Sequence, residues 1–168
     1  MISRRTFHRI GLGGVAAATF GSYSYSISSA QAKEGFEITK SDSEWRKILT
    51  RDQYYVLRQH GTERARSSAL DKIYDPGTYI CAGCELPLYS SETKFDSGTG
   101  WPSFWQPLDN AVGESTDYKL VYPRTEVHCR RCGGHLGHVF KDGPAPTGLR
   151  YCMNGVAMKF VPENKQAS

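Results

Sequence analysis

The first 32 residues contain no acidic side chain and no long apolar run. They hold three arginines, Arg4, Arg5 and Arg9, and continue into a stretch rich in glycine, alanine and serine that ends in Ala30-Gln31-Ala32. Because glycine, serine and tyrosine dilute residues 11–32, this stretch makes a poor membrane-spanning helix. The layout is typical of an export signal with a small-residue cleavage site; a disordered basic tail or a membrane anchor is the alternative.

The segment Ser3-Arg4-Arg5-Thr6-Phe7 is similar to the twin-arginine signature, which directs folded proteins to export. We therefore predict that residues 1–32 are a twin-arginine-type signal peptide, cleaved after Ala32. Residues 33–168 then form the mature domain. We expect it in the periplasm, with no stable membrane insertion after cleavage.

The mature chain lacks a charge excess of either sign. Without the three arginines of the signal, 18 of the 21 basic residues remain against 17 acidic residues. Nucleic-acid binding usually needs a clustered positive face, so a nucleic-acid partner has no bulk electrostatic support. We interpret residues 58–66 and the pair Arg130-Arg131 as solvated surface. The chain also has no internal repeat after residue 33, and its length indicates one domain.

The mature chain has two parts that differ in predicted secondary structure. Residues 41–60 predict one or two short helices, with Asp42 or Ser43 as the first cap, a capping box from Thr50 to Gln53, and Gly61 as a stop. From Tyr79 on, short β-prone segments alternate with glycine, proline and aspartate, which is typical of antiparallel strands and tight turns. These segments are residues 78–82, 118–123, 125–129, 135–140 and 150–154. We predict a small helical N-terminal segment on a mainly β (α+β) body.

Four of the five cysteines form two Cys-x-x-Cys pairs, Cys81 with Cys84 and Cys129 with Cys132. Two such pairs can supply the closed tetrahedron of thiolates that zinc prefers. The same spacing suits iron, and export makes in-pair or crossed disulfides an alternative. A thioredoxin-like redox pair is disfavoured because neither pair lies at a strand end before a long helix.

The fifth cysteine, Cys152, lies alone in a segment with the alternation of a strand. Cys152 and Asn154 then share one face, and Tyr151 and Met153 share the other. On this evidence a buried structural cysteine and a catalytic one are equally good interpretations.

Two histidines and an aromatic loop favour catalysis. His135 and His138 can each lower a thiol pKa or donate a proton near neutral pH, although a core, surface or metal-ligand role is the alternative. Positions three apart face opposite ways in a regular strand, so both reach Cys152 only if the pleat breaks at or near Gly137. Trp101 follows two glycines that let the backbone approach a ligand closely, whereas a core role is the default for its ring.

The segments CAGC, KFDSGTGWPSFW, RTEVHCRRCGGHLGHVF and GLRYCMNG resemble the B-type peptide methionine sulfoxide reductases, which reduce the R epimer of methionine sulfoxide. The resemblance covers nearly all of residues 41–161. It implies two antiparallel β-sheets in a zinc-stapled β-tent, with one structural zinc ion on the four paired cysteines. We expect a monomer that acts on oxidised proteins or free methionine sulfoxide.

The resemblance implies a role for each candidate site residue. Cys152 would be the nucleophile, Trp101 the wall for the substrate methyl group with Phe140 beside it, and Arg150 a stabiliser of the thiolate. His135, His138 and Asn154 would bind or protonate the sulfoxide oxygen.

The sequence departs from one version of the family at Thr99, where many members place a resolving cysteine. Without that thiol, the resemblance implies that a Cys152 sulfenic acid is reduced by an external thiol, such as that of a thioredoxin-like protein. Two other functions stay open: a zinc-stapled module that grips a peptide without chemistry, and a Cys-His hydrolase, which would consume no reductant.

Overall fold

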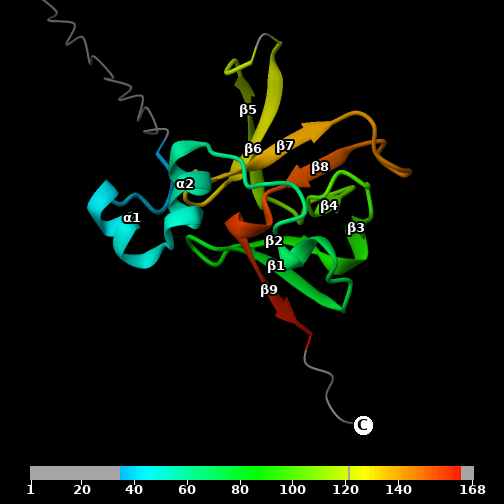
Figure 1. The fold of residues 1–168 in the computed structure, drawn as a ribbon, viewed down its shortest axis with the longest axis horizontal. Helices are drawn as coiled ribbons and strands as arrows, with labels where there is room; N and C mark the ends of the chain where they lie inside the picture. The colour runs from blue at the N-terminus through cyan, green and yellow to red at the C-terminus, as the bar shows by residue number, and fades with distance from the viewer. Residues whose placement is uncertain (1–34, 121, 164–168) are drawn as a thin grey trace, which may run out of the picture. The chain divides into compact units, whose positions relative to one another are not determined.

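The computed structural model describes residues 35–120 and 122–163, so the predicted signal peptide, residues 1–32, lies outside the described residues. The described part begins with two short helices, α1 (Asp42–Ile48) and α2 (Arg51–Gln59). Short antiparallel strands follow, with single turns of 3-10 helix between some of them (Figure 1). Within these ranges, no helix combines the length and the apolar character that crossing a membrane requires.

A capping box starts helix α1. Ser41 is the N-cap: its side chain accepts from the Glu44 N–H, and the Glu44 carboxylate accepts from the Ser41 N–H at 2.8 Å. The prediction of Asp42 or Ser43 as the cap is therefore wrong by one or two residues. The reason is the position of Glu44, since only a cap three residues before it can form the reciprocal pair.

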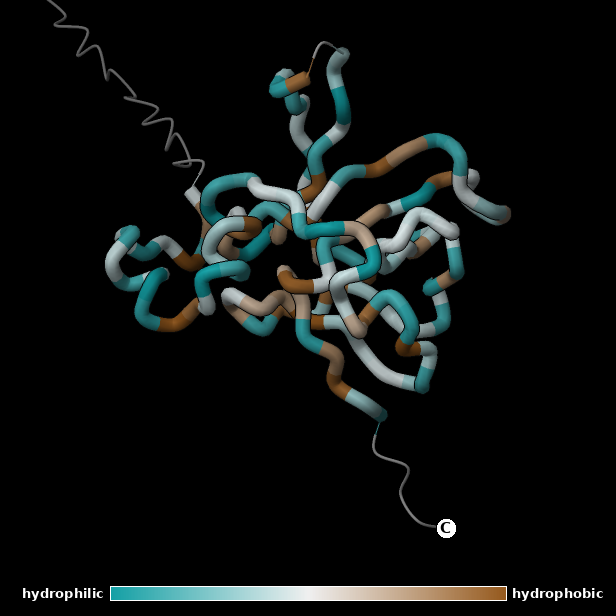
Figure 2. The backbone as a smooth tube through the Cα atoms, in the orientation of Figure 1, coloured by the Kyte–Doolittle hydropathy of each residue, from teal (hydrophilic) through white to brown (hydrophobic). Residues whose placement is uncertain are grey.

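Helix α2 begins and ends as the sequence predicts. Thr50 and Gln53 form the second capping box, with N···O distances of 3.0 and 3.2 Å. The helix ends at His60, which adopts the left-handed conformation with φ of 54°, and Gly61 follows. Both helices alternate between hydrophilic and hydrophobic segments (Figure 2), as expected for helices with one face on the body of the protein.

The strands form two antiparallel sheets. One has the order β2-β1-β9, and the other the order β3-β4-β8-β7-β6-β5. The strands are β1 (Gly77–Cys81), β2 (Pro87–Ser90), β3 (Lys94–Phe95), β4 (Ser103–Phe104), β5 (Val112–Asp117), β6 (Arg124–Cys129), β7 (His135–Phe140), β8 (Arg150–Met153) and β9 (Met158–Pro162). The predicted mainly β fold with two antiparallel sheets and a helical N-terminal segment is confirmed.

One predicted strand is wrong. The described residues of 118–123 lie in the connection between β5 and β6, and Tyr118 and Tyr122 are 77% and 61% exposed. Strand β5 ends because the Asp117 side chain accepts from the Lys119 N–H at 2.9 Å, which turns the chain. The β-prone composition predicted a strand here, but the described residues of this segment pair with no other strand.

Aromatic rings join the two sheets. Tyr89 of β2 stacks on Phe104 of β4 with ring centroids 4.3 Å apart, and Tyr79 of β1 meets Phe104 edge-on at 4.9 Å. All three rings are fully buried, and the Tyr89 hydroxyl donates to the Met153 sulfur at 3.1 Å. This contact places β8, the strand of Cys152, firmly on the core.

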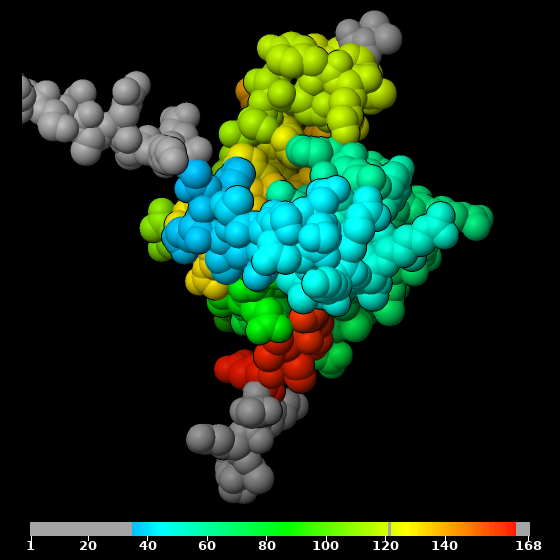
Figure 3. Space-filling view, turned by 90° about the vertical axis from the view of Figure 1, so that its left-hand side faces the viewer, coloured from blue at the N-terminus to red at the C-terminus, as the bar shows by residue number. Residues whose placement is uncertain are grey.

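The two helices cover one side of the body, as Figure 3 shows in cyan. Buried Trp45 and Leu57 lie against the two Cys-x-x-Cys turns, so closely that a Cβ on Gly134 would meet Leu57 at 2.8 Å. Arg58 adds a hydrogen bond to the Cys132 carbonyl at 3.0 Å. The interpretation of residues 58–66 as solvated surface is therefore wrong for Arg58.

Strand β7 contains the irregularity that the spacing of its histidines predicts. Val127 pairs with Gly137, but the next residue, His128, pairs with His135, so Leu136 is the extra residue of a β-bulge. The bulge reverses the alternation of side chains. His135 and His138 therefore lie on the same side, with ring centroids 5.3 Å apart.

Close pairing of β7 with β8 fixes the position of Cys152. His138 is opposite Cys152, and Gly137 is opposite Met153. A Cβ on Gly137 would lie 2.2 Å from the Cys152 carbonyl oxygen, so only glycine permits this approach.

We therefore expect Gly137→Ala to destabilise the protein by about 1–3 kcal/mol, as overpacking against backbone does. Urea unfolding followed by far-UV circular dichroism measures the change. Gly83→Ala is the matched control, because the nearest atom to its added Cβ is 3.5 Å away. Equal stabilities of the two variants would contradict the close approach of β7 and β8.

Candidate active site and metal centre

One face of the β7–β8 pair carries four of the predicted site residues. His138 pairs with Cys152 and Phe140 with Arg150, so the register places all four side chains on the same face. Arg150 lies over the Phe140 ring, with its guanidinium carbon 4.4 Å from the ring centroid.

A small cavity opens at this face. Its volume is about 120 Å³, and its lining residues are Thr62, Trp101, Arg124, Gly137, His138, Phe140, Cys152 and Asn154. A larger hollow of about 580 Å³ beside the helices is lined by residues from Arg46 to Gln59 and contains neither a thiol nor an imidazole. Reactive groups, rather than volume, therefore identify the candidate site.

The Cys152 thiol is partly buried beside two hydroxyls. The Thr99 hydroxyl lies 3.8 Å from its sulfur, and Ser103 pairs with it on strand β4. Burial raises the pKa of Cys152, whereas Thr99, Arg150 and Ser103 act in the opposite direction without cancelling it. The free protein therefore holds Cys152 mainly as the thiol at neutral pH.

Arg150 is fixed beside that thiol. Its guanidinium donates two hydrogen bonds to the Asp142 carboxylate, at 2.9 and 2.8 Å. It shares a face with Cys152 but is not among the residues that line the cavity.

His138 reaches the cavity with one ring nitrogen already engaged. Its Nε2 lies 2.7 Å from the Asp117 carboxylate, which also accepts from Arg124 at 2.7 Å. The hydrogen bond from the Lys119 N–H, and then those from His138 and Arg124, hold the pKa of Asp117 well below its usual range. The carboxylate is therefore ionised and can only accept hydrogen bonds. His138 Nε2 must therefore carry the hydrogen, which leaves Nδ1 as the free nitrogen. Burial lowers the pKa of His138, so the ring is neutral at pH 7.

Glu63 connects Trp101 and Asn154, two residues that line the cavity. No sequence pattern indicated a role for Glu63. Its backbone carbonyl accepts from the Trp101 indole at 3.2 Å, and its N–H donates to the Asn154 side chain at 2.9 Å. Its carboxylate accepts from the N–H groups of Gly155 and Val156, at 2.5 and 3.0 Å. The charged segment around it suggested solvated surface, an interpretation that is wrong for Glu63.

Asn154 has both ends of its amide bound to backbone. Besides the bond from Glu63, its Nδ2 donates to the Leu136 carbonyl at 2.9 Å. Asn154 is 4% exposed and joins the bulge of β7 to the wall that carries Trp101.

His135 turns away from the cavity. Its Nδ1 lies 2.7 Å from the Glu126 carboxylate, and its side chain is 3% exposed. The structure therefore gathers Trp101, His138, Phe140, Cys152 and Asn154 around one cavity and leaves His135 and Arg150 beside it.

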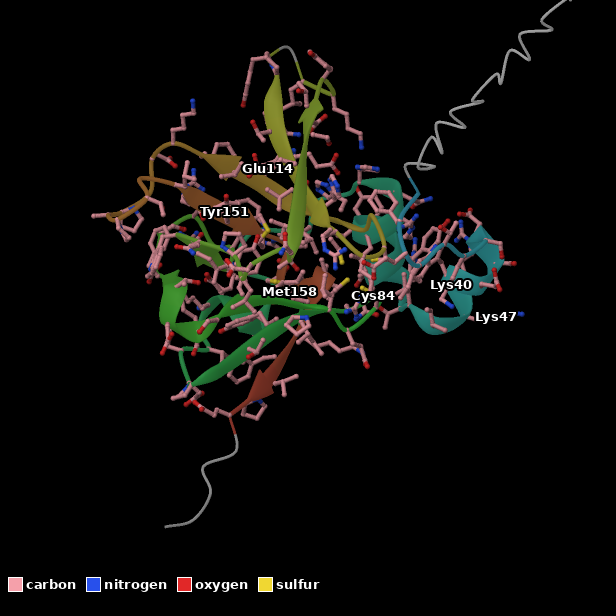
Figure 4. The ribbon with its side chains drawn as sticks, turned by 180° about the vertical axis from the view of Figure 1, so that it is seen from behind. Lys40, Lys47, Cys84, Glu114, Tyr151 and Met158 are labelled. Atoms are coloured by element: carbon pink, nitrogen blue, oxygen red, sulfur yellow. The ribbon has the colours of Figure 1, made fainter. Side chains whose placement is uncertain are left out.

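The four paired cysteines converge at a second site, near the helices, where Figure 4 labels Cys84. Their sulfurs all lie within 4.8 Å of one another, at 3.8 Å for Cys81 and Cys132 and 3.4 Å for Cys84 and Cys129. None of the described cysteines is in a disulfide. A tetrahedron with Zn–S bonds of ~2.3 Å has sulfurs about 3.8 Å apart, so these donors can hold a metal such as zinc.

Tight backbone turns build this centre. Cys81 ends β1, and its carbonyl accepts from the Glu85 N–H at 2.8 Å. Cys129 ends β6, and its carbonyl accepts from the Gly133 N–H at 2.9 Å, where φ of +66° requires glycine. The centre thus joins one strand of each sheet.

The fold and the two sites define a β protein with a cavity that contains one cysteine and a separate group of four cysteines that can hold a metal ion. Residues 49–162 match the SelR domain model. The chain belongs to that family, the MsrB-type peptide methionine sulfoxide reductases. Membership favours the reductase over the binding-module and hydrolase interpretations.

Curated relatives cover most of the chain. A peptide methionine sulfoxide reductase MsrB of Leptospira interrogans is 55% identical over 129 residues, 76% of this chain and 98% of that protein. Proteins of the same name from Agrobacterium fabrum and Methanosarcina barkeri are each 52% identical, over 75% and 76% of this chain and 94% and 91% of their own lengths.

We expect Glu63→Ala to cost about 2 kcal/mol of stability, because two N–H groups lose a charged acceptor. Turnover should fall as well, since the wall with Trp101 and Asn154 loosens. Urea unfolding and steady-state kinetics measure both, with exposed Arg64→Ala as the control. Wild-type stability and turnover in Glu63→Ala would contradict the role of Glu63 in the wall.

We also expect the alkylation rate of Cys152 by iodoacetamide to rise with pH and to keep rising above about pH 8.5, the ordinary thiol range. The sign follows from burial, which raises the pKa and postpones thiolate formation. Cys152→Ser corrects for alkylation of the other four cysteines. A rate that levels off near pH 7 would show that the thiolate is preformed.

Proposed function

We propose that this protein reduces methionine (R)-S-oxide, in proteins or free, with Cys152 as the nucleophile. The observation that carries the proposal is the cavity that Cys152 shares with an imidazole, His138, and an indole, Trp101. A sulfoxide needs all three, because its sulfur is electrophilic, its oxygen leaves only when protonated, and its methyl group is apolar.

The reaction balances with two residues of the chain. The free Nδ1 of His138 accepts the Cys152 proton, and Asp117 stabilises the imidazolium that forms. The proton passes to the sulfoxide oxygen as that oxygen moves from the substrate sulfur to the Cys152 sulfur. The substrate sulfur is reduced by two electrons to methionine, and Cys152 is oxidised to the sulfenic acid.

The remaining site residues position the substrate, Cys152 and His138. Trp101, held by Glu63, offers an apolar face for the methyl group, and Phe140 extends it. Exchanging the oxygen and methyl positions would set the oxygen against the indole, which favours one epimer. Asn154 holds the wall that carries Trp101, and the His135 ring packs against that of His138. The Arg150 guanidinium stabilises the Cys152 thiolate as it forms.

We propose zinc for the four-cysteine site. The spacing of its sulfurs supports this metal, and none of the four cysteines lines the reactive cavity. Zinc would link β1 to β6 and stabilise the fold, with no part in the reaction.

Recycling requires an external thiol in this proposal. Thr99, at the place of the resolving cysteine in other members, has its hydroxyl 3.8 Å from the Cys152 sulfur but cannot form a disulfide. The sulfenic acid would then be reduced by a thiol protein of the thioredoxin type or by a small thiol.

We further propose export to the periplasm by the twin-arginine route, with residues 1–32 as the cleaved signal. The Arg4-Arg5 pair supports the route. Folding before export would let the four cysteines bind metal before they meet an oxidant.

Single-turnover reactions of the reduced protein with each epimer, without added thiol, test the function. We expect about one equivalent of methionine from the R epimer and none from the S epimer, with Cys152 sulfenate as the protein product. Cys152→Ser, the control, should yield nothing. Turnover of both epimers, or of neither, would contradict the proposal.

A second prediction follows from the presence of Thr99 at the position of the resolving cysteine. Because Thr99 touches Cys152, Thr99→Cys should convert the sulfenate into a disulfide between positions 99 and 152 during a single turnover. Peptide mapping by mass spectrometry detects the bond, and Ser97→Cys is the control for a thiol elsewhere in the loop. Persistent sulfenate in Thr99→Cys would mean that the loop does not bring position 99 to Cys152.

A further inference from the structure

A second group of potential metal ligands lies behind the active site. His60, at the end of α2, meets Glu126 of β6 and His135 of β7, and one ligand atom of each lies within 4.8 Å of the others. The Nδ1 atoms of His60 and His135 lie 2.8 and 2.7 Å from the same Glu126 oxygen. Neither His60 nor Glu126 belongs to the proposed reaction.

The Glu126 carboxylate is prepared as a ligand. Burial raises the pKa of Glu126, but hydrogen bonds from His135 and Ser115, together with the charge interactions with His135 and His60, outweigh burial and lower this pKa to about 2, so the carboxylate is ionised at neutral pH. The Ser115 hydroxyl donates to its second oxygen at 2.7 Å, which fixes the carboxylate from behind. Such support of a ligand by an outer hydrogen bond is usual in protein metal sites.

The cluster is closed on one side and open on the other. The side chains of His135 and Glu126 are 3% and 11% exposed, whereas that of His60 is 46% exposed. A cation can therefore enter beside His60 and keep water on its open side. Two imidazoles and one carboxylate with open positions are a ligand set that suits zinc and its neighbours in the first transition row.

We propose that His60, Glu126 and His135 form a second site for a divalent transition-metal ion such as Zn²⁺ or Co²⁺. Binding requires each imidazole to carry its hydrogen on Nε2, so that the Nδ1 atom, which now donates to Glu126, is free to bind the ion. It also widens the ligand spacing from hydrogen-bond distance to about 3.4 Å, the separation that bonds of ~2.1 Å impose. Exposed His60 is free to make this adjustment.

Occupancy of this site would affect the proposed active site. The His135 ring centroid is 5.3 Å from that of His138, so a cation on His135 opposes the positive charge that His138 acquires during the proposed reaction. The expected result is slower turnover when the site is filled. This consequence, unlike the site itself, rests on the proposed function.

Equilibrium dialysis of the full chain in a Cys152→Ser background tests the site without any activity measurement. With the four-cysteine centre already loaded with zinc, we expect one Co²⁺ per chain, with the visible absorption of nitrogen and oxygen ligands and no thiolate charge-transfer band. His60→Asn should lose this Co²⁺ and keep its zinc. Asparagine is a matched substitution because it tolerates the left-handed conformation of His60.

His128→Asn is the control, since His128 is a neighbouring histidine outside the ligand set; it should retain the Co²⁺. No Co²⁺ on the parent protein, or equal binding by His60→Asn, would overturn the site. In the wild-type background, added Zn²⁺ should slow turnover at least threefold, and His60→Asn should resist it. Equal inhibition of the two proteins would overturn the effect on His138 and leave the dialysis result to decide the site.

Discussion

The close pairing of β7 with β8 is the constraint on which the reactive site depends. Gly137 has no side chain, so the two strands approach closely enough to set His138 opposite Cys152. The bulge at Leu136 then turns His135 to the same side as His138. A regular β7 would separate these histidines, and a bulkier residue at 137 would push β8 and its thiol away.

Segments distant in sequence from β7 and β8 supply the remaining residues of the candidate site. The β5–β6 hairpin supplies Asp117 and Arg124, which orient His138 and settle its tautomer. The segment after α2 supplies Glu63, which holds Trp101 and Asn154. The four-cysteine centre brings together the ends of β1 and β6, so a metal ion bound there would tie the sheet that carries the site to the other sheet.

The sequence predicts features set by short spacings. The Cys-x-x-Cys pairs, the Thr50 capping box and the break of pleat near Gly137 each follow from a few adjacent residues, and each is present in the structure. Glu63 and Asp117 could not be predicted, because their partners lie 91 and 21 residues away in Asn154 and His138. The composition of residues 118–123 led to a wrong prediction of a strand. A β-prone segment forms a strand only where the tertiary structure supplies a partner strand.

A crystal structure of the wild-type protein, after reaction with one equivalent of methionine (R)-S-oxide and no thiol, tests the central claim most directly. That claim is that Cys152 and His138 act on one substrate oxygen within the cavity. The account predicts a single added oxygen on the Cys152 sulfur, within hydrogen-bond distance of His138. An unmodified Cys152, or an oxygen directed away from His138, would contradict it.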